Sequence, residues 1–313
     1  MAWTTDSLVT AVKRKAFAPS TRWPFTDQQV LDIAWEEMMK RVVPAVRSIR
    51  ENYWTTTLNT TLVVDSLNAY PTFVRVPTRA SASTATSVWI VRTNGDLVRL
   101  TRVSAVERMY LDALTASGQG GPSVYALEGD KLHLYPPINQ AGLVLRVQYD
   151  RRPALLVPVS SAGLVSVVAA SAITAAGGTF GASPTIDVVQ ANPPCDLLLD
   201  SIASTYVPSV FTLAPNATVG KGIAVGDYVC PYGYTCVLPL PDALHVALID
   251  LTVAACKSEQ RDYARAEAIR GEVDSYMPAL LQTLAVRVSA DPPIVFNRDS
   301  PLRSGLSGRW GRW

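Results

Sequence analysis

Hydrophobic residues near the start of the chain repeat with the spacing of an α-helix. They recur every three or four positions within residues 8–16 and again within residues 30–49. Thr26 and Gln29 stand at the start of the second run with the spacing of a capping box. Pro44 lies inside that run, where it should kink or restart the helix. The pattern therefore predicts an N-terminal pair of helices.

Two more helical patterns occur near the other end. Pro241 suits a first helical position, and apolar residues follow at helical spacing within 244–255 and 263–284. Polar residues at 258–261 separate these two runs. Helices with one apolar face must bury it, so we expect the N- and C-terminal helices to pack together in one bundle.

Between the helices the pattern changes to that of antiparallel β-structure. The apolar runs 88–91 and 97–100 flank Asn94-Gly95, a strong short-range signal for a hairpin. Leu143, Leu145, Val147 and Tyr149 alternate with other residues, as in a half-buried strand. Further strands are predicted at 125–127 and 132–135, and a short helix at 104–116, where Ser104 and Glu107 form a second capping box.

Residues 155–240 have a different composition. The segment is rich in Val, Ala, Ser, Thr, Gly and Pro, and Lys221 is its one basic residue. Such a composition favours short strands and turns. The sequence thus predicts an α+β fold of four parts: residues 1–57 and 241–288 as a helical bundle, 58–154 as a β-hairpin and strand region with a short helix, 155–240 as an inserted β-rich region, and 289–313 as an extended C-terminal arm.

The C-terminal arm lacks any periodicity and contains several Pro and Gly residues. It has five Arg and two Asp between Arg287 and Trp313, and it ends Arg309-Trp310-Gly311-Arg312-Trp313. Trp and Arg are enriched among interface hot spots, so an arm that orders on a partner is one interpretation. A terminus with incidental tryptophans and an arm that stacks on nucleic acid are the alternatives.

Composition and missing motifs argue against several other functions. Among the 313 residues, 48% are hydrophobic and 17% charged, and the net charge of +2 is too small for a nucleic-acid-binding polycation. The most apolar stretch, 162–176, is shorter than the roughly 20 residues that a membrane helix needs. The four cysteines and two histidines lack metal-site spacing, and a reducing cytoplasm disfavours a Cys230–Cys236 disulfide. No phosphate loop or nucleophile motif occurs. We therefore assign no catalytic, cofactor-binding or metal-binding residue.

The order of several short segments resembles podovirus-type head-to-tail adaptor (connector) proteins of bacteriophages, over about residues 5 to 285. The segments are DSL (6–8), RKAF (14–17), FTDQQVL (25–31), VVP (42–44), RENY (50–53), PSVYALEGDKLHLYPP (122–137), LRVQYDRRP (145–153) and GDYV (226–229), with the paired C-terminal helices.

The resemblance implies a structural virion protein without cofactor or catalysis. It implies a homo-oligomeric ring of twelve copies between the phage portal protein and the tail tube or nozzle protein. Genome DNA would pass through the lumen without sequence-specific binding. The expected location is the virion neck, between capsid and tail, after assembly in the host cytoplasm. Another neck protein, such as a stopper or tail terminator, is one alternative, and a cell-wall hydrolase carried in the virion is another.

Three sets of residues follow as candidate contact sites. The arm is expected to bind the portal, and the aromatics of the β-rich insertion are expected to face the tail or a neighbouring subunit, unless they fill a local core. Apolar residues of the second helix could form the ring interface, or simply fill the core. The arm residues are Phe296, Arg298, Leu302, Arg303, Leu306, Arg309, Trp310, Arg312 and Trp313; the aromatics are Phe180, Tyr206, Phe211, Tyr228, Tyr232 and Tyr234; the ring candidates are Trp35, Met38 and Met39.

Overall fold

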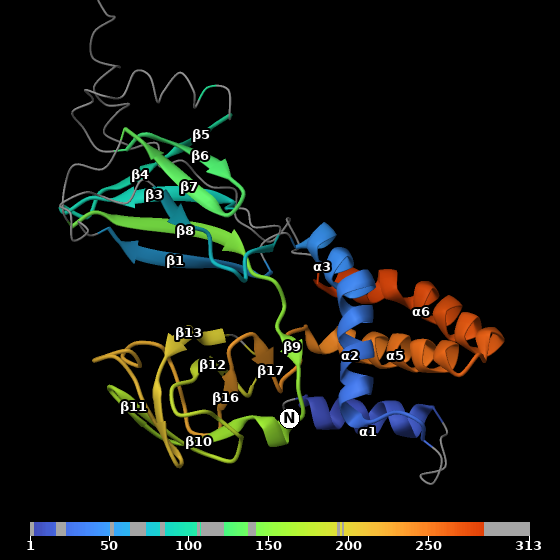
Figure 1. The fold of residues 1–313 in the computed structure, drawn as a ribbon. Helices are drawn as coiled ribbons and strands as arrows, with labels where there is room; N and C mark the ends of the chain where they lie inside the picture. The colour runs from blue at the N-terminus through green and yellow to red at the C-terminus, as the bar shows by residue number, and fades with distance from the viewer. Residues whose placement is uncertain are drawn as a thin grey trace, which may run out of the picture.

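The computed structural model describes residues 3–16, 23–50, 53–62, 73–81, 85–104, 107, 122–136, 142–192, 195 and 197–284. These residues form three parts: a group of helices, a first β region above it in the view, and a second β region beside the helices (Figure 1). The mixed α+β class expected from the sequence is confirmed.

The N-terminal helices have the ends that the sequence predicts. They are α1 (Thr5–Lys15), α2 (Asp27–Glu37), a π-helical turn at Met38–Val42 and α3 (Val43–Ile49). The Thr26–Gln29 capping box is present at the start of α2. Pro44 lies in the first turn of α3, where no intrahelical N–H bond is required, so the chain restarts as a helix after the π turn.

The C-terminal helices are α5 (His245–Glu259) and α6 (Tyr263–Leu284). Pro241 precedes a 3₁₀ turn at Asp242–Leu244, so the α-helix begins later than the sequence predicts. The apolar residues expected at helical spacing within 244–255 are buried, and α5 is buried on its other sides as well because α1, α2 and α6 all pack against it. Apolar side chains of all these helices share one core.

The first β region consists of two four-stranded sheets. Their orders are β1-β8-β3-β4 and β2-β7-β6-β5, and they share one apolar core. The strands are β1 (Thr55–Thr61), β2 (Phe73–Arg75), β3 (Ser87–Val91), β4 (Leu97–Arg99), β5 (Thr101–Val103), β6 (Val124–Glu128), β7 (Lys131–Tyr135) and β8 (Val144–Asp150).

The predicted hairpin around Asn94-Gly95 is confirmed, since β3 and β4 pair antiparallel. The expectation of purely antiparallel pairing is wrong at one place, because β5 and β6 run parallel. Parallel neighbours need a long crossover, and the twenty residues between these strands are long enough to provide it.

The second β region is built on a seven-stranded antiparallel sheet of order β13-β12-β16-β10-β11-β15-β14, with its own apolar core. The strands are β10 (Gly163–Ala169), β11 (Ala172–Ala176), β12 (Thr185–Val189), β13 (Leu197–Ala203), β14 (Thr205–Val207), β15 (Val210–Thr212) and β16 (Tyr228–Pro231). A short parallel pair, β9 (Leu155–Leu156) and β17 (Tyr234–Thr235), lies between this sheet and the helices (Figure 1).

Contacts between distant parts of the sequence join the three regions. The Thr5 hydroxyl at the start of α1 donates to the carbonyls of Val157 and Cys236, beside the β9–β17 pair. Trp54, which follows α3 and precedes β1, is buried in the helical core, and its indole N–H donates to the Pro239 carbonyl at 3.3 Å. The β regions therefore pack directly onto the helices.

Candidate functional site

A cluster of charged side chains joins the two β regions. Arg79, from the segment after β2, donates from Nη1 to Asp187 on β12 at 2.6 Å and to Asp200 on β13 at 3.3 Å. Arg79 is nearly buried and Asp187 is fully buried. A buried carboxylate must be paired, because an unpaired charge there would cost several kcal/mol. The contact therefore fixes one β region against the other.

Further polar groups complete this cluster. The backbone N–H groups of Ser201 and Gly233 donate to Asp187 at 2.9 Å each, and the Tyr149 hydroxyl donates to Asp200 at 3.4 Å. Burial raises the pKa of Asp187 although Arg79 and the two N–H groups act in the opposite direction. Burial also raises the pKa of the Tyr149 hydroxyl, and the Asp200 carboxylate adds to that effect. Both carboxylates thus have partners already and are poorly placed for acid–base catalysis.

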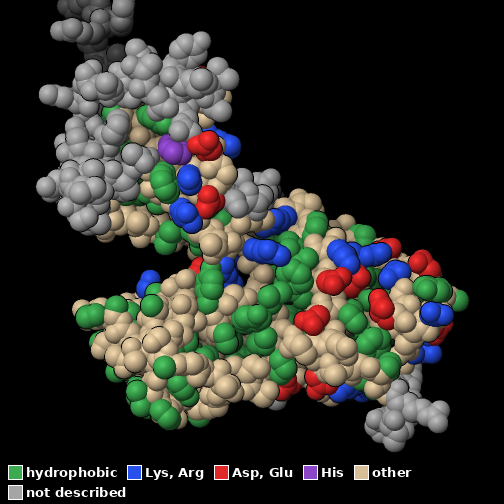
Figure 2. All heavy atoms as spheres, viewed as in Figure 1, with side chains coloured by type: hydrophobic (Ala, Val, Ile, Leu, Met, Phe, Trp, Pro, Cys, Tyr) green, Lys and Arg blue, Asp and Glu red, His purple; other side chains and the backbone are tan. Residues whose placement is uncertain are grey.

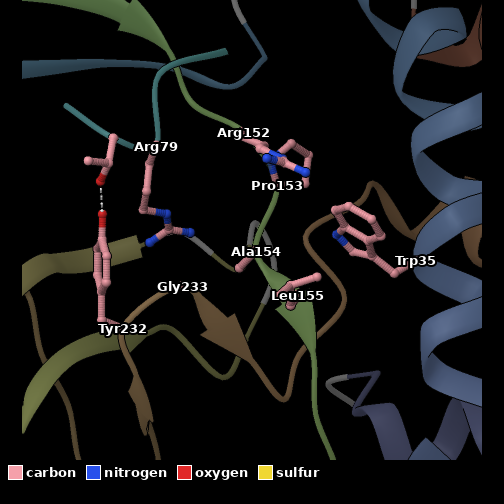
Figure 3. Close-up of a pocket in the computed structure, with 9 residues that line it drawn as sticks. Trp35, Arg79, Arg152, Pro153, Ala154, Leu155, Tyr232 and Gly233 are labelled. Carbon is pink, nitrogen blue, oxygen red and sulfur yellow. Dashed lines mark hydrogen bonds between the residues drawn. The ribbon is translucent and has the colours of Figure 1, made fainter. Parts of the chain in front are cut away.

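A pocket of about 300 Å³ opens beside the cluster, where both β regions meet the helices. Figure 3 shows Trp35 of α2 on one side and Arg79 and Tyr232 on the other, with the chain from Arg152 to Leu155 between them. The Arg152 guanidinium lies 5.4 Å from the Trp35 ring centroid, a cation–π contact. Thr78 and Tyr232 are joined by a hydrogen bond between their hydroxyls.

The pocket has the chemistry of a contact surface. A stacked arginine, a tryptophan and the apolar Pro153 and Ala154 form its wall. Among the described residues, no group of three or more His, Cys, Asp or Glu side chains could hold a metal ion.

The three ring candidates have different environments. Trp35 is half-buried at the pocket, and its indole N–H has no hydrogen-bond partner among the described residues. Met39 is half-buried as well. Met38 is fully buried in the helical core, which removes it from any surface that a second copy could contact. The neighbouring Glu37 is also buried, and its carboxylate lies 3.8 Å from the Arg41 guanidinium.

The aromatic residues of the second β region divide into two groups. Phe180, Tyr206 and Phe211 pack on one another with ring centroids 4.7 to 5.5 Å apart, and Phe211 is fully buried. This is the local core that the sequence left open as an alternative. Tyr228 and Tyr232 are half-buried, and Tyr234 is exposed.

A second candidate surface is the outside of the second β region. Seven of the eleven exposed large hydrophobic side chains in the described parts of the chain lie within residues 155–240. Of the charged residues described there, Asp187 and Asp227 are buried and Asp200 is paired with Arg79, which leaves Lys221 exposed. Figure 2 accordingly shows large areas of this region without red or blue side chains. The exposed residues are Leu155, Leu164, Val167, Val207, Val219, Val225 and Tyr234; we call them the uncharged surface.

Sequence reasoning missed the Arg79 cluster. Arg79 and Asp187 are 108 positions apart, and no local pattern connects them. One usable signal existed, since Asp187 is a rare charged residue in the β-rich segment 155–240, and the structure places it within β12 (Thr185–Val189).

The remaining candidate residues are isolated or lie elsewhere. Cys230 and Cys236 are free, buried thiols with their sulfur atoms 3.9 Å apart. Ser104 and Glu107 form the expected reciprocal cap, while most of the predicted helix 104–116 lies outside the described residues. The portal-arm candidates also lie outside them: Phe296, Arg298, Leu302, Arg303, Leu306, Arg309, Trp310, Arg312 and Trp313.

Comparisons with known proteins add to this geometry. A family model described as SU10 adaptor protein matches residues 3–176, more than half of the chain. The match runs from α1 to β11 and includes the helices α1–α3 and the whole first β region. Among curated proteins, none matches the sequence. No helix in the described ranges is long and apolar enough to cross a bilayer.

Proposed function

The chain belongs to the SU10 adaptor protein family of bacteriophage structural proteins, and we propose from this that its copies form a ring that connects the portal to the tail. The observation that carries the proposal is the family match, which is continuous over residues 3–176. The resemblance of the C-terminal helices to the same kind of protein extends it. The protein would be a component of the virion neck, assembled in the host cytoplasm. Genome DNA would pass through the ring without being bound in a sequence-specific way.

We propose a division of work between the parts of the chain. Residues 1–57 and 241–288 would form the helical body of the ring, and 58–154 the β region fixed to it. Residues 155–240 would face the tail tube or nozzle, and 289–313 would reach the portal. A stopper or tail-terminator role remains the alternative within the virion, but the family match favours the adaptor.

The ring interface would include the pocket beside Trp35. A ring of twelve copies needs two different surfaces on each copy that fit one another. Trp35 offers an aromatic ring, and Arg152 offers a cation that forms no ion pair among the described residues. Both Trp and Arg are frequent in interface hot spots. Met39 would lie at the edge of this contact.

The uncharged surface would face the tail. Its exposed side chains are apolar, and one exposed lysine gives it almost no charge. Such a surface suits contact with protein, because phosphate binding requires several cations. The near-neutral charge of the whole chain likewise suits a lumen through which DNA slides.

A structural role also fits the carboxylates. Asp187 and Asp250 are buried, and each is held by a cation and a hydrogen-bond donor, Asp250 by Lys15 and the Tyr276 hydroxyl. Purified protein should therefore fail to clear peptidoglycan. Clearing that is lost on changing a single Glu would contradict the non-enzymatic proposal.

Electron microscopy of the protein mixed with portal tests the main proposal. We expect a ring stacked on the portal for the full chain. A variant that lacks residues 289–313 should keep the helical bundle folded and lose the stacked ring. If the truncated protein still joins the portal normally, the assignment of the arm is wrong. If neither protein forms a ring with portal, the adaptor proposal itself is wrong.

A further inference from the structure

Among the described residues, no strand pairs with the outer edge of β1, and β1 lacks the usual protection of edge strands. It is seven residues long, Thr55–Thr61, and it is the outermost strand of its sheet. It pairs with β8 over its whole length in continuous register. Its sequence, TTTLNTT, contains no charged residue and no proline. Natural proteins block edge strands with charges, proline, bulges or short length, because free edges accept other strands.

The other edges of the three larger sheets in the described chain do have such protection. The three-residue strands β2, β4 and β5 each contain an arginine, namely Arg75, Arg99 and Arg102. β13 has an irregular register and a left-handed Ser201, and β14 has three residues before Pro208. Against these, β1 is long, regular and uncharged.

The register shows which backbone groups of β1 point outward. Leu62 donates to the Leu143 carbonyl, and Arg151 donates to the Trp54 carbonyl, so even-numbered positions bond to β8. The N–H and C=O groups of successive residues in a strand point to opposite sides, so those of Thr57, Asn59 and Thr61 point away from β8. No backbone hydrogen bond joins these three residues to another described segment. In Figure 1, β1 is the strand of the first β region that lies nearest the second one.

The chain itself contains a segment that fits this edge. The described chain ends at Leu284, and 29 residues follow. Within them, Pro293 and Pro301 enclose the seven residues 294–300, the length of β1. Proline cannot donate to a β ladder, so it would limit pairing to this stretch. The stretch begins Ile294-Val295-Phe296, residues that favour strands.

The position of Leu284 makes such pairing possible within one chain. α6 contacts α3, and α3 leads into β1 (Figure 1). The nine residues from 285 to 293 can span about 30 Å when extended. A short tether of this kind gives the segment a local concentration of order millimolar at the edge.

We propose that residues 294–300 of the same chain add to the free edge of β1 as a fifth strand of the β1-β8-β3-β4 sheet. The outward groups of Thr57, Asn59 and Thr61 provide the hydrogen bonds. Ile294 and Phe296 can lie on the face of the sheet that holds Leu58, which is now exposed. This pairing would place Phe296 and Arg298 beside β1, so the portal contact proposed for the arm would be made by its residues beyond Pro301.

Disulfide trapping in the purified full chain tests the pairing. The four native cysteines are buried, so they give little background. Asn297→Cys is combined with Thr57→Cys or Thr61→Cys, and a matched control combines it with Leu97→Cys, an exposed position at the opposite edge of the same sheet. Under mild oxidation we expect intramolecular cross-links to β1 in at least one pair, and none to Leu97. Equal cross-linking to Leu97, or covalent dimers in place of intramolecular links, would overturn the proposal.

A proline scan supplies an independent readout. Thr57→Pro removes an outward N–H and should leave the folding transition nearly unchanged while it abolishes the cross-link to Thr61→Cys. Leu58→Pro removes an N–H that bonds to β8 and should lower the melting temperature. In the full chain, Val295→Pro should speed hydrogen exchange of the Thr57, Asn59 and Thr61 amides about tenfold or more. Unchanged exchange in Val295→Pro would refute the pairing. None of these experiments needs a portal, so their failure leaves the adaptor proposal untouched.

Discussion

At the scale of single residues, the most consequential contact is the ion pair of Arg79 with Asp187. The two side chains come from different β regions and lie at 2.6 Å in a buried environment. Desolvation makes such a pair a weak source of net stability, but the loss of one partner leaves an uncompensated buried charge. The pair therefore acts chiefly to fix how the regions sit together.

Asp187→Ala should lower the free energy of unfolding by about 3–5 kcal/mol, because it leaves the nearly buried Arg79 with the more exposed Asp200 alone. Asp200→Ala is the matched control and should cost about 1 kcal/mol or less, since Asp200 is partly solvated. Urea denaturation of both variants measures the difference. Equal losses for the two substitutions would show that the buried pair has no special role.

His245 should make the protein sensitive to mild acid. It is buried beside Trp3 at the start of α5, and its Nε2 lies 3.1 Å from the Leu240 carbonyl. Burial lowers the pKa of His245, so the folded state holds the neutral ring and the unfolded chain takes up a proton first. The contribution of His245 is therefore intact well above pH 6.5 and decreases as the pH falls through about 6.5, the unfolded value.

We expect the free energy of unfolding to drop between about pH 7.5 and 5.5, with a slope of at most about 1.4 kcal/mol per pH unit from this residue. His245→Gln should flatten that slope, whatever its effect on stability at neutral pH. Chemical denaturation across this pH range gives the measurement. An unchanged slope in the variant would mean that His245 is not the group that titrates.

At the scale of elements, the sequence predicted those whose signal is local. The hairpin at Asn94-Gly95 and the cap at Thr26 follow from a few neighbouring residues, and both are present. The burial of α5 on nearly all sides depends on three other helices, and the parallel β5–β6 pair depends on a crossover. The Arg79 cluster depends on how whole regions pack. None of these has a sequence period of its own, so periodicity could not reveal them.

The end of α2 and the π turn after it offer a direct comparison of core and surface. Met38→Ala removes a fully buried side chain and should cost about 2–5 kcal/mol of stability, yet leave ring formation intact under folding conditions. Trp35→Ala should destabilise the monomer less and weaken the ring, because Trp35 lies at the pocket that we assign to the interface. Thermal unfolding and native mass spectrometry separate the two effects. If the loss of ring formation in each variant simply follows its loss of stability, Trp35 acts only as a core residue and not at the ring interface.

At the scale of the whole molecule, charge is distributed unevenly. Charged side chains are frequent on the face of the helices that Figure 2 shows, whereas the second β region exposes mostly neutral and apolar groups. The family match ends at residue 176, within that region, so most of its seven-stranded sheet lies beyond the matched part. Four residues of the uncharged surface, Val207, Val219, Val225 and Tyr234, lie beyond the matched part.

Charged residues introduced on the uncharged surface should prevent attachment of the tail but leave folding and ring formation unchanged. Val167 and Val225 are exposed by 55% and 71%, so Val167→Lys with Val225→Lys should leave the folding transition unchanged. Because the wild-type surface is almost free of charge, its contact should persist when salt rises from about 0.1 M to about 1 M, conditions that screen ionic contacts. Leu97→Lys, at an equally exposed position of the first β region, controls for added charge. Electron microscopy of neck complexes gives the measurement, because the number of rings and the number of rings that carry a tail can be counted separately. If rings of the double variant still carry tails, the tail contact lies elsewhere on the molecule.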